Sequence, residues 1–337
     1  MSAAPRTKPV IAVTMGDPAG VGPEVCLRLT AHAEVLEMAR PVVFGSLQVL
    51  QSCATATGLP LPPRVIAAGQ WPDAVPRLDG PAVLDLAGMD MARLEPGKVS
   101  AETGAAAFGY VEQAISAALA GEVAAVTTAP LNKEALHAAG IDFPGHTELF
   151  AARTGAARSC MLQYSAEVRA SFVTVHCGYH EVPGLLSVER VVEVIELTAE
   201  AMRRLRSARP KLAVLGLNPH AGEHGLFGCR EEERIIQPAI DEARRRGHDV
   251  EGPLPPDTAF LPWRRQEVDC FVCMYHDQGH IPLKALAFDS AVNTTLGLPI
   301  IRTSVDHGTA CDIAWQGRAN PGSLIEAVKM AVRLSQG

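Results

Sequence analysis

Short apolar runs that alternate with amphipathic segments constrain the fold of this chain more than any other feature of its sequence. Strand-like runs occur at residues 10–14, 42–44, 82–86, 123–127, 170–175, 212–217, 270–275 and 300–304. Segments with helical spacing, such as 103–120 and 188–206, lie between them. This alternation predicts an α/β fold in which a parallel or mixed sheet has helices on both faces.

The size and composition of the chain limit the classes of protein that it can represent. A length of 337 residues is enough for two domains, and the absence of a repeat or low-complexity linker predicts that they are tightly packed and discontinuous. Hydrophobic residues make up 47% and charged residues 20% of the chain, as in globular proteins. No apolar stretch approaches the roughly 20 residues that span a bilayer, and residues 1–8 lack the apolar region of a signal peptide. We therefore expect a cytoplasmic enzyme with no membrane partner.

Charge and cysteine usage exclude two further classes. The net charge of −7 argues against nucleic acid as the main partner, and the basic runs at 203–209 and 244–246 lie where helices are expected to end. Eight cysteines at irregular spacing indicate reduced thiols. Cys270 and Cys273 form a C-x-x-C pattern, but it lies in a strand-like run where residues three apart face opposite sides, which argues against a redox or zinc motif.

Three of the strand-like runs are each followed by a histidine. His176 follows the run 170–175, His220 comes shortly after 212–217, and His276 follows 270–275. Open α/β sheets bind ligands beyond the carboxyl ends of their strands, so three imidazoles there can surround one divalent ion and leave room for a substrate. A single such histidine is more often a core residue, and the recurrence carries the prediction. Asp277, beside His276, suits the orientation of a ligand or of a metal-bound water.

Other polar segments predict contacts with an anion. The turn 16–24 is rich in glycine but matches neither the dinucleotide-binding fingerprint nor the Walker motif, so it is either a tight turn or a site of close ligand approach. At 145–148, His146 and Thr147 begin a helix-like segment, where they serve as a cap or bind phosphate. Lys284, Asn293 and Arg302 add donors that hold phosphate or carboxylate.

At these residues the chain resembles the 4-hydroxythreonine-4-phosphate dehydrogenase family of vitamin B6 biosynthesis. The resemblance runs in order through the segments 16–24, 145–148, 218–223, 275–284 and 302–310. It implies two α/β/α domains around a cleft, as in isocitrate and isopropylmalate dehydrogenases, and not a Rossmann fold. It also implies a homodimer with the active site at the subunit interface.

The resemblance assigns roles to individual residues. The implied metal ligands are His176, His220 and His276, one of them donated by the other subunit, with Zn, Mg, Mn, Co or Ni as the divalent ion. The implied substrate contacts are His146, Thr147, Lys284, Asn293 and Arg302. A bound cation would lower the pKa of the substrate hydroxyl. Lys284 and Asp257 are candidates to move its proton, and Asp277 is a third catalytic candidate.

A second resemblance concerns the cofactor. The segment formed by His307, Gly308, Thr309 and Ala310, followed by Asp312, is similar to the adenosine-binding loop of the β-decarboxylating dehydrogenases, and implies a site for NAD or NADP. We accordingly expect one domain from residues 1–128 and 305–337, with the glycine-rich and cofactor loops. The other, from residues 129–304, is expected to carry the metal and substrate site and the dimer interface.

The family implies oxidation of 4-phosphohydroxy-L-threonine to the 3-keto acid, which decarboxylates to 3-amino-2-oxopropyl phosphate in pyridoxal 5'-phosphate biosynthesis. Residues 129–136 and 279–283 are similar instead to a branch of D-threonate or D-erythronate 4-phosphate dehydrogenases of sugar-acid catabolism, and the residues leave this choice open. Two other classes are a metal-dependent phosphohydrolase, for which carboxylate ligands are few, and a metal- and ligand-binding protein without turnover.

Overall fold

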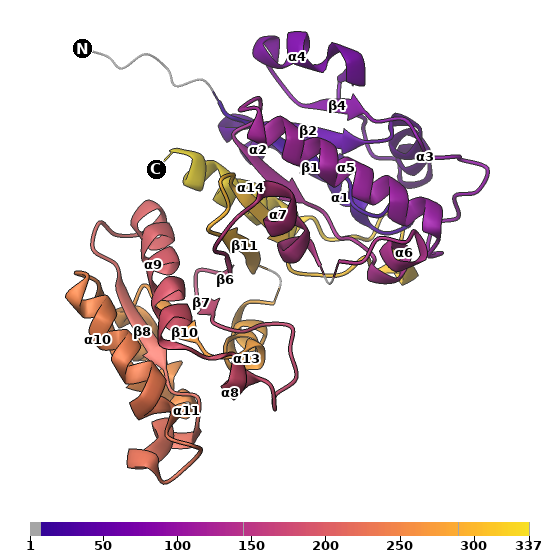
Figure 1. Ribbon diagram of the computed structural model, residues 1–337. Coiled ribbons are helices and arrows are strands. Elements are labelled where there is room, and N and C mark those ends of the chain that lie inside the picture. Colours follow the sequence, from indigo (N-terminus) through magenta and orange to yellow (C-terminus); the bar gives the residue numbers. More distant parts are fainter. Residues whose placement is uncertain (1–7, 144, 289, 337) are drawn as a thin grey trace, which may run out of the picture. The chain divides into compact units, whose positions relative to one another are not determined.

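The computed structural model describes residues 8–143, 145–288 and 290–336 and divides them into two compact units (Figure 1). Unit 1 comprises the described residues up to Ala156 together with Leu298–Gln336, and unit 2 comprises Ala157–Gly297. Apart from Lys8, the segment used in the signal-peptide argument lies outside the described residues. No helix in the described ranges is long and apolar enough to cross a membrane.

Unit 1 is built on a parallel sheet with the strand order β3-β4-β2-β1-β5-β12. Its strands are β1 (Val10–Thr14), β2 (Arg40–Gly45), β3 (Arg64–Ala67), β4 (Ala82–Asp85), β5 (Ala125–Thr128) and β12 (Arg302–Val305). Its helices are α1 (Gly22–Thr30), α2 (Ala33–Met38), α3 (Leu47–Thr57), α4 (Trp71–Ala74), α5 (Ala101–Leu119), α6 (Lys133–Ala138), α7 (His146–Thr154) and α14 (Gly322–Gln336). The central strand residues Val13, Val43 and Val126 are fully buried, as expected for a sheet covered on both faces.

Unit 2 is built on a mixed sheet with the order β11-β6-β7-β10-β8-β9. Its strands are β6 (Cys160–Tyr164), β7 (Arg169–Phe172), β8 (Lys211–Leu215), β9 (Asp249–Leu254), β10 (Cys270–Cys273) and β11 (Val292–Leu296). Its α-helices are α8 (Val182–Leu185), α9 (Val188–Leu205), α10 (Gln237–Arg245), α11 (Pro256–Ala259), α12 (Pro262–Glu267) and α13 (His276–Ala287). Strands β7, β10, β8 and β9 are parallel, whereas β6 is antiparallel to both β7 and β11.

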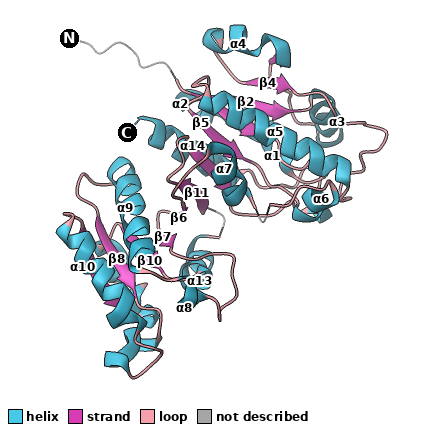
Figure 2. Cartoon of the chain, viewed as in Figure 1, coloured by secondary structure: helices cyan, strands magenta, loops and turns pink. Residues whose placement is uncertain are grey.

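The two longest helices begin where the sequence provides a cap. The hydroxyl of Ser100 accepts a hydrogen bond from the N–H of Thr103 at the start of α5, and that of Ser187 accepts one from Arg190 at the start of α9. Capping of this kind satisfies N–H groups that have no partner within the helix. Helix α9 then packs on β6, β7, β8 and β10, and α13 packs on β7 and β10 (Figure 2). The helices predicted at 103–120 and 188–206 are therefore confirmed.

All eight apolar runs contain strands, with ends that shift by a few residues. Four strands were not predicted: β3, β6, β9 and β11. Three of them lack a continuous apolar run, because β6 and β11 carry the polar residues Gln163, Asn293 and Thr294, and β9 contains Gly252 and Pro253. The fourth, β3, has only a short apolar run at residues 65–67. Cross-strand pairing, rather than local apolar character, places these segments in the sheet.

The boundaries between the units differ from the expected ones. Helix α7 packs on α5, which moves the first boundary from 128/129 to 156/157. Strand β12 pairs in parallel with β5, which moves the second boundary from 304/305 to 297/298. As a result His146, Thr147 and Arg302 lie in unit 1, and the candidate metal ligands lie in unit 2.

The glycine-rich turn after β1 packs against its own chain. Gly16 has a φ of +72°, and a Cβ there would lie 2.3 Å from the carbonyl oxygen of Pro130; a Cβ on Gly22 would lie 2.0 Å from that of Met15. The buried carboxyl group of Asp17 accepts a hydrogen bond from the N–H of Ala19 at 2.9 Å, and burial raises its pKa. These contacts support the tight-turn interpretation of this segment.

The eight cysteines are free, in agreement with the expectation of reduced thiols. Cys270 and Cys273 are buried in β10, and burial raises the pKa of both thiols. Thiols of this kind do not form the reactive thiolate that redox chemistry needs.

Two glycines of α5 provide a matched test of this packing. A Cβ on Gly104 would lie 2.1 Å from the carbonyl oxygen of Ala135, whereas one on Gly109 would meet nothing within 4 Å. Gly104→Ala is expected to destabilise the protein by about 1–3 kcal/mol because α6 must shift. Gly109→Ala is expected to stabilise it by up to about 1 kcal/mol through helix propensity. Calorimetric melting temperatures check this, and equal values for the two variants would contradict the packing described.

Candidate active site

The three strands that precede the histidines lie side by side in unit 2. Strand β10 pairs in parallel with β7 on one side and with β8 on the other, so the carboxyl ends of all three strands meet at one edge. His176 lies just beyond β7, His276 begins α13 directly after β10, and His220 lies in the loop after β8. The topological part of the sequence prediction is confirmed.

Hydrogen bonds beyond the strand ends bring two of the histidines together. Thr174 contacts the carbonyl oxygen of Met274 twice, through its N–H at 3.2 Å and its hydroxyl at 2.8 Å. Each of these residues lies two positions before a histidine. The imidazole rings of His176 and His276 are 5.9 Å apart between centroids. The two rings of this pair follow two neighbouring strands, β7 and β10.

A carboxylate orients one of the two rings. Nδ1 of His276 lies 2.7 Å from Oδ1 of Asp277, and Oδ2 of Asp277 accepts a hydrogen bond from the hydroxyl of Tyr179. These two hydrogen bonds, that from Tyr179 foremost, lower the pKa of Asp277. With Nδ1 engaged, Nε2 of His276 is the nitrogen that is left to bind an ion. Asp277 therefore has the geometry of an orienting group.

His280 is a further functional candidate beside this pair. Its ring stacks on that of His276, with 3.7 Å between centroids and 6° between planes, and on Phe172 at 4.6 Å. Its Nδ1 lies 3.0 Å from the carbonyl oxygen of His276, and its Nε2 lies 3.2 Å from Nε2 of Gln163. His276, His280 and Lys284 are spaced by four residues and so share one face of α13. That spacing is the sequence signal that identifies them as a group.

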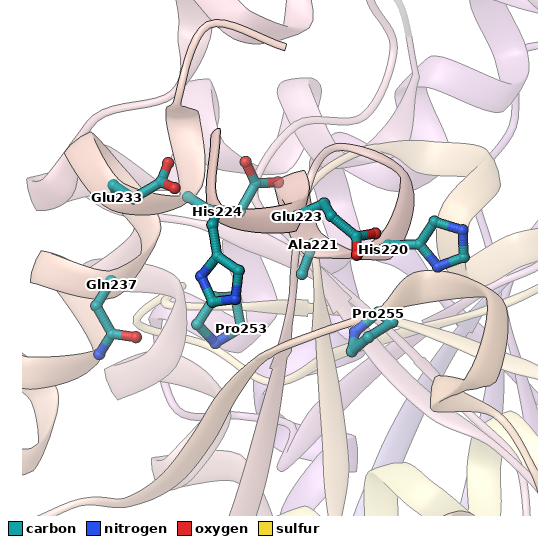
Figure 3. A pocket seen from close by; sticks show the side chains of 9 residues that line it. His220, Ala221, Glu223, His224, Glu233, Gln237, Pro253 and Pro255 are labelled. Atoms are coloured by element: carbon teal, nitrogen blue, oxygen red, sulfur yellow. The ribbon is translucent and has the colours of Figure 1, made fainter. Parts of the chain in front are cut away.

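His220 is presented separately from this pair. Its Nδ1 lies 4.0 Å from Oδ2 of Asp257, and both side chains are more than half exposed. A pocket of about 530 Å³ lies beside its loop, lined by His220, Ala221, Glu223, His224, Glu232, Glu233, Gln237, Pro253 and Pro255. In Figure 3 the imidazole of His224 turns toward Pro253, whereas that of His220 points away from it. Within the described part of one chain, no three His, Cys, Asp or Glu side chains are close enough to hold a metal ion.

Unit 1 contributes a separate cationic site. The buried guanidinium of Arg302 donates a hydrogen bond from Nη2 to the hydroxyl of Thr128 at 2.9 Å and lies 5.4 Å from the ring centre of Phe150. Burial lowers its pKa to about 9 against the opposing effect of Glu148, so it is still protonated at neutral pH. Thr147 lies in the first turn of α7, beside His146 and Glu148.

His146 has a neutral ring in this surrounding. The residue is half-buried, but its Nε2 atom is inaccessible to solvent and has no hydrogen-bond partner among the described residues. Burial, and secondly the charge of Arg302, hold the pKa of His146 well below its ordinary value. A buried polar atom of this kind is usually satisfied by a ligand or by water.

Asn293 in β11 lies directly opposite Gln163 in β6, so the two side chains share a face of the sheet. The Oδ1 atom of Asn293 is buried and has no hydrogen-bond partner among the described residues. Gln163, which was not predicted as a site residue, connects this position to His280. Gln163 can be recognised as a site residue only once strand β6, which was not predicted, is known.

The predicted cofactor loop packs against the glycine-rich turn within unit 1. The carbonyl oxygen of Thr309 accepts a hydrogen bond from the N–H of Val21 at 2.9 Å, and Ala310 has a φ of +41°. Nδ1 of His307 lies 2.9 Å from the carbonyl oxygen of Gly308, and its buried Nε2 has no hydrogen-bond partner among the described residues. Asp312 is exposed. The turn after β1 therefore helps to fix the backbone of this loop.

Comparisons with known proteins identify the family of the chain. The family model described as pyridoxal phosphate biosynthetic protein PdxA matches residues 37–331. A 4-hydroxythreonine-4-phosphate dehydrogenase from Desulfosudis oleivorans is 46% identical, with 96% of each chain covered. A D-threonate 4-phosphate dehydrogenase from Cupriavidus necator is 45% identical, with 97% of each chain covered.

The fold of the chain is also similar to that of a solved protein structure. The crystal structure of a 4-hydroxythreonine-4-phosphate dehydrogenase from Klebsiella pneumoniae superposes with a TM-score of 0.86 at 41% identity, covering 99% of this chain and 100% of the other. The fold is thus the α/β fold of these dehydrogenases and not a simple Rossmann fold. The chain belongs to the PdxA family and is a dehydrogenase.

Proposed function

We propose that this protein is a metal-dependent dehydrogenase that uses NAD or NADP to oxidise a phosphorylated hydroxy acid in the cytoplasm. The observation that carries the proposal is the pair His176 and His276, set 5.9 Å apart between ring centroids beyond the carboxyl ends of two adjacent strands. Family membership argues against the phosphohydrolase and the binding protein without turnover.

The residues present fit a divalent ion such as Zn, Mg, Mn, Co or Ni. Two imidazoles converge, and Asp277 leaves Nε2 of His276 available as a donor atom. We assign the third ligand to His220 of the partner subunit, since His220 of the same chain lies beside Asp257 instead. When bound, the ion would supply a Lewis acid that lowers the pKa of the substrate hydroxyl.

Exposed apolar side chains on unit 2 support a homodimer with the site at its interface. Large hydrophobic residues with more than a third of their surface exposed occur at nine positions of unit 2: Tyr179, Leu185, Leu226, Phe227, Leu261, Trp263, Ile281, Leu286 and Phe288. Exposed apolar side chains in such numbers favour an interface with another chain. Leu226 and Phe227 directly follow the loop that carries His220.

The substrate groups follow from the remaining donors. We assign the phosphate to the guanidinium of Arg302 and to His146 and Thr147, with Asn293 and Lys284 as further contacts. The neutral ring of His146 is a hydrogen-bond donor that adds no second charge beside Arg302. We assign the transfer of the hydroxyl proton to Asp257 or Lys284. We assign the cofactor to the loop formed by His307, Gly308, Thr309, Ala310 and Asp312, in which the buried Nε2 of His307 has no hydrogen-bond partner among the described residues.

The choice of acid defines two candidate functions. Relatives at 46% and 45% identity are a 4-hydroxythreonine-4-phosphate dehydrogenase and a D-threonate 4-phosphate dehydrogenase. The first of these activities, on 4-phosphohydroxy-L-threonine, would give a 3-keto acid that decarboxylates to 3-amino-2-oxopropyl phosphate, for pyridoxal 5'-phosphate synthesis. The second, on D-threonate or D-erythronate 4-phosphate, keeps the same chemistry and belongs to sugar-acid breakdown.

Initial rates of NADH formation with a divalent metal present test this proposal. The substrates are 4-phosphohydroxy-L-threonine, D-threonate 4-phosphate and D-erythronate 4-phosphate, with unphosphorylated D-threonate as the control. We expect turnover of at least one phosphorylated acid, loss of that turnover with a chelator, and negligible kcat/KM for the control because it has no phosphate for Arg302 to bind. Absence of turnover with all three phosphorylated acids would refute the proposed substrate class.

Subunit complementation tests the origin of the third ligand. His220→Ala and His276→Ala are each expected to be folded and inactive as homodimers. A heterodimer of the two variants, isolated with two affinity tags, would contain one intact site if His220 acts across the interface. We expect about half of the wild-type activity per dimer.

The matched control is the heterodimer of His176→Ala with His276→Ala, which has no intact site in this arrangement. An inactive His220→Ala/His276→Ala heterodimer would show that all three ligands come from one chain. Normal activity in the His220→Ala homodimer would remove the metal assignment altogether.

A further inference from the structure

The loop that carries His220 has an unusual backbone. Five consecutive residues, from His220 to His224, have left-handed dihedral angles, with φ between 45° and 80°. Four of the five are not glycine: His220, Ala221, Glu223 and His224. For L-residues this conformation is unfavourable because Cβ crowds the backbone, and such stretches persist only where their surroundings hold them.

A buried carboxylate holds the start of this loop. Glu232 is 2% exposed, and its Oε1 accepts hydrogen bonds from the N–H groups of Leu217 at 2.9 Å and Asn218 at 2.8 Å. Its Oε2 accepts a third from Nδ2 of Asn218 at 3.0 Å. Asn218 is separated from the left-handed turn only by Pro219, and these bonds hold both its backbone and its side chain.

The neighbouring Glu231 also binds Asn218. Its Oε2 accepts hydrogen bonds from Nδ2 of Asn218 at 2.9 Å and from the N–H of Cys229 at 2.8 Å. Burial opposes ionisation of Glu231, but these hydrogen bonds and one from its own backbone outweigh it and lower its pKa. The two carboxylates thus fasten Asn218 from one side.

The turn itself lies directly on Glu232. A Cβ on Gly222 would come within 2.6 Å of Oε2 of Glu232, and one on Gly216 would come within 2.7 Å of Cα of Ala221. Glu232 opens a single π-helical turn, Glu232–Ile236, a local distortion often found at functional sites. In the view of Figure 3, Glu233 of this π-helical turn lies on one side of the loop residues His224 and Glu223, and His220 lies on the other.

The partners of Glu232 distinguish it from a structural ion pair. Among the described residues Glu232 takes part in no ion pair, and its side chain accepts hydrogen bonds from two backbone N–H groups and one side-chain amide, all within the segment that leads to His220. Burying a carboxylate on amide donors alone is costly compared with an apolar side chain. The cost is understandable if the position of the loop matters to the site.

We propose that Glu232 is a positioning residue that holds the left-handed turn, and through it the imidazole of His220, in the geometry required for binding a divalent metal. The inference rests on the proposed function, in which His220 is a metal ligand. Glu232 itself touches neither the metal nor the substrate. Its contribution is to restrict the conformation of the loop in the metal-free protein.

The test is the affinity of the full-length dimer for Co²⁺, measured by competition with a chromophoric chelator, in Glu232→Gln and in the matched control Glu233→Gln. Glu233 lies in the same π-helical turn and makes no hydrogen bond to Leu217 or Asn218 among those described. Gln has an NH2 group in place of one carboxylate oxygen of Glu, so that an N–H group would face an N–H donor of the loop. We expect Glu232→Gln to weaken Co²⁺ binding about 10- to 100-fold and Glu233→Gln to leave it unchanged.

Two readouts separate positioning from a merely structural role. Saturating Co²⁺ should restore most of the kcat of Glu232→Gln, and the visible absorption of bound Co²⁺ should change at a temperature where the variant is folded. Glu232→Gln with wild-type Co²⁺ affinity would overturn the inference. If that variant does not fold, Asn218→Ala takes its place and is expected to weaken Co²⁺ binding in the same direction, with unchanged affinity as the contrary result.

His220→Ala distinguishes failure of the inference from failure of the proposed function. Loss of Co²⁺ affinity in His220→Ala combined with wild-type affinity in Glu232→Gln would reject the role of Glu232 alone. Wild-type affinity in both variants would reject His220 as a ligand, and the inference with it.

Discussion

The site depends on hydrogen bonds that connect the carboxyl ends of three neighbouring strands. Gln278 accepts a hydrogen bond from the N–H of Met274 at 2.7 Å and donates one to the carbonyl oxygen of Gly216 at 2.7 Å, which joins the end of β10 to the end of β8. Thr174 joins the end of β7 to the same segment. Because Gln278 is buried, these bonds are shielded from water, and breaking them would leave polar groups unsatisfied. The histidine loops therefore start from a rigid edge.

From this edge the loops are supported to different degrees. His276 is held by Asp277 and by stacking on His280, so its ring has little freedom. His220 lies on an exposed left-handed turn and depends on the carboxylate behind it. This division fits a site that two subunits complete, with one part preorganised in each chain and the other presented outward to a partner.

The sequence predicts the parallel strands well, because continuous apolar runs are the signature of strands that are covered on both faces. It also places three histidines beyond the ends of such strands, whereas the pairing of β10 with β7 and β8 that makes these strands neighbours is visible only in the structure. It does not predict β6 and β11, which carry the polar residues Gln163 and Asn293 and join the sheet through cross-strand pairing. The boundaries between the units differ from the expected ones because α7 packs on α5 and β12 pairs with β5. It also does not predict the role of Glu232, since a carboxylate that binds backbone N–H groups leaves no spacing pattern.

The most direct test of this account is the position of the metal ion itself. Anomalous diffraction from crystals of the Co²⁺-loaded protein locates the ion without reference to activity. The account predicts one peak for each protomer, with His176 and His276 of that protomer and His220 of the partner subunit as its protein ligands. A peak that lies away from His176 and His276, or one that is completed by side chains other than His220, would contradict it.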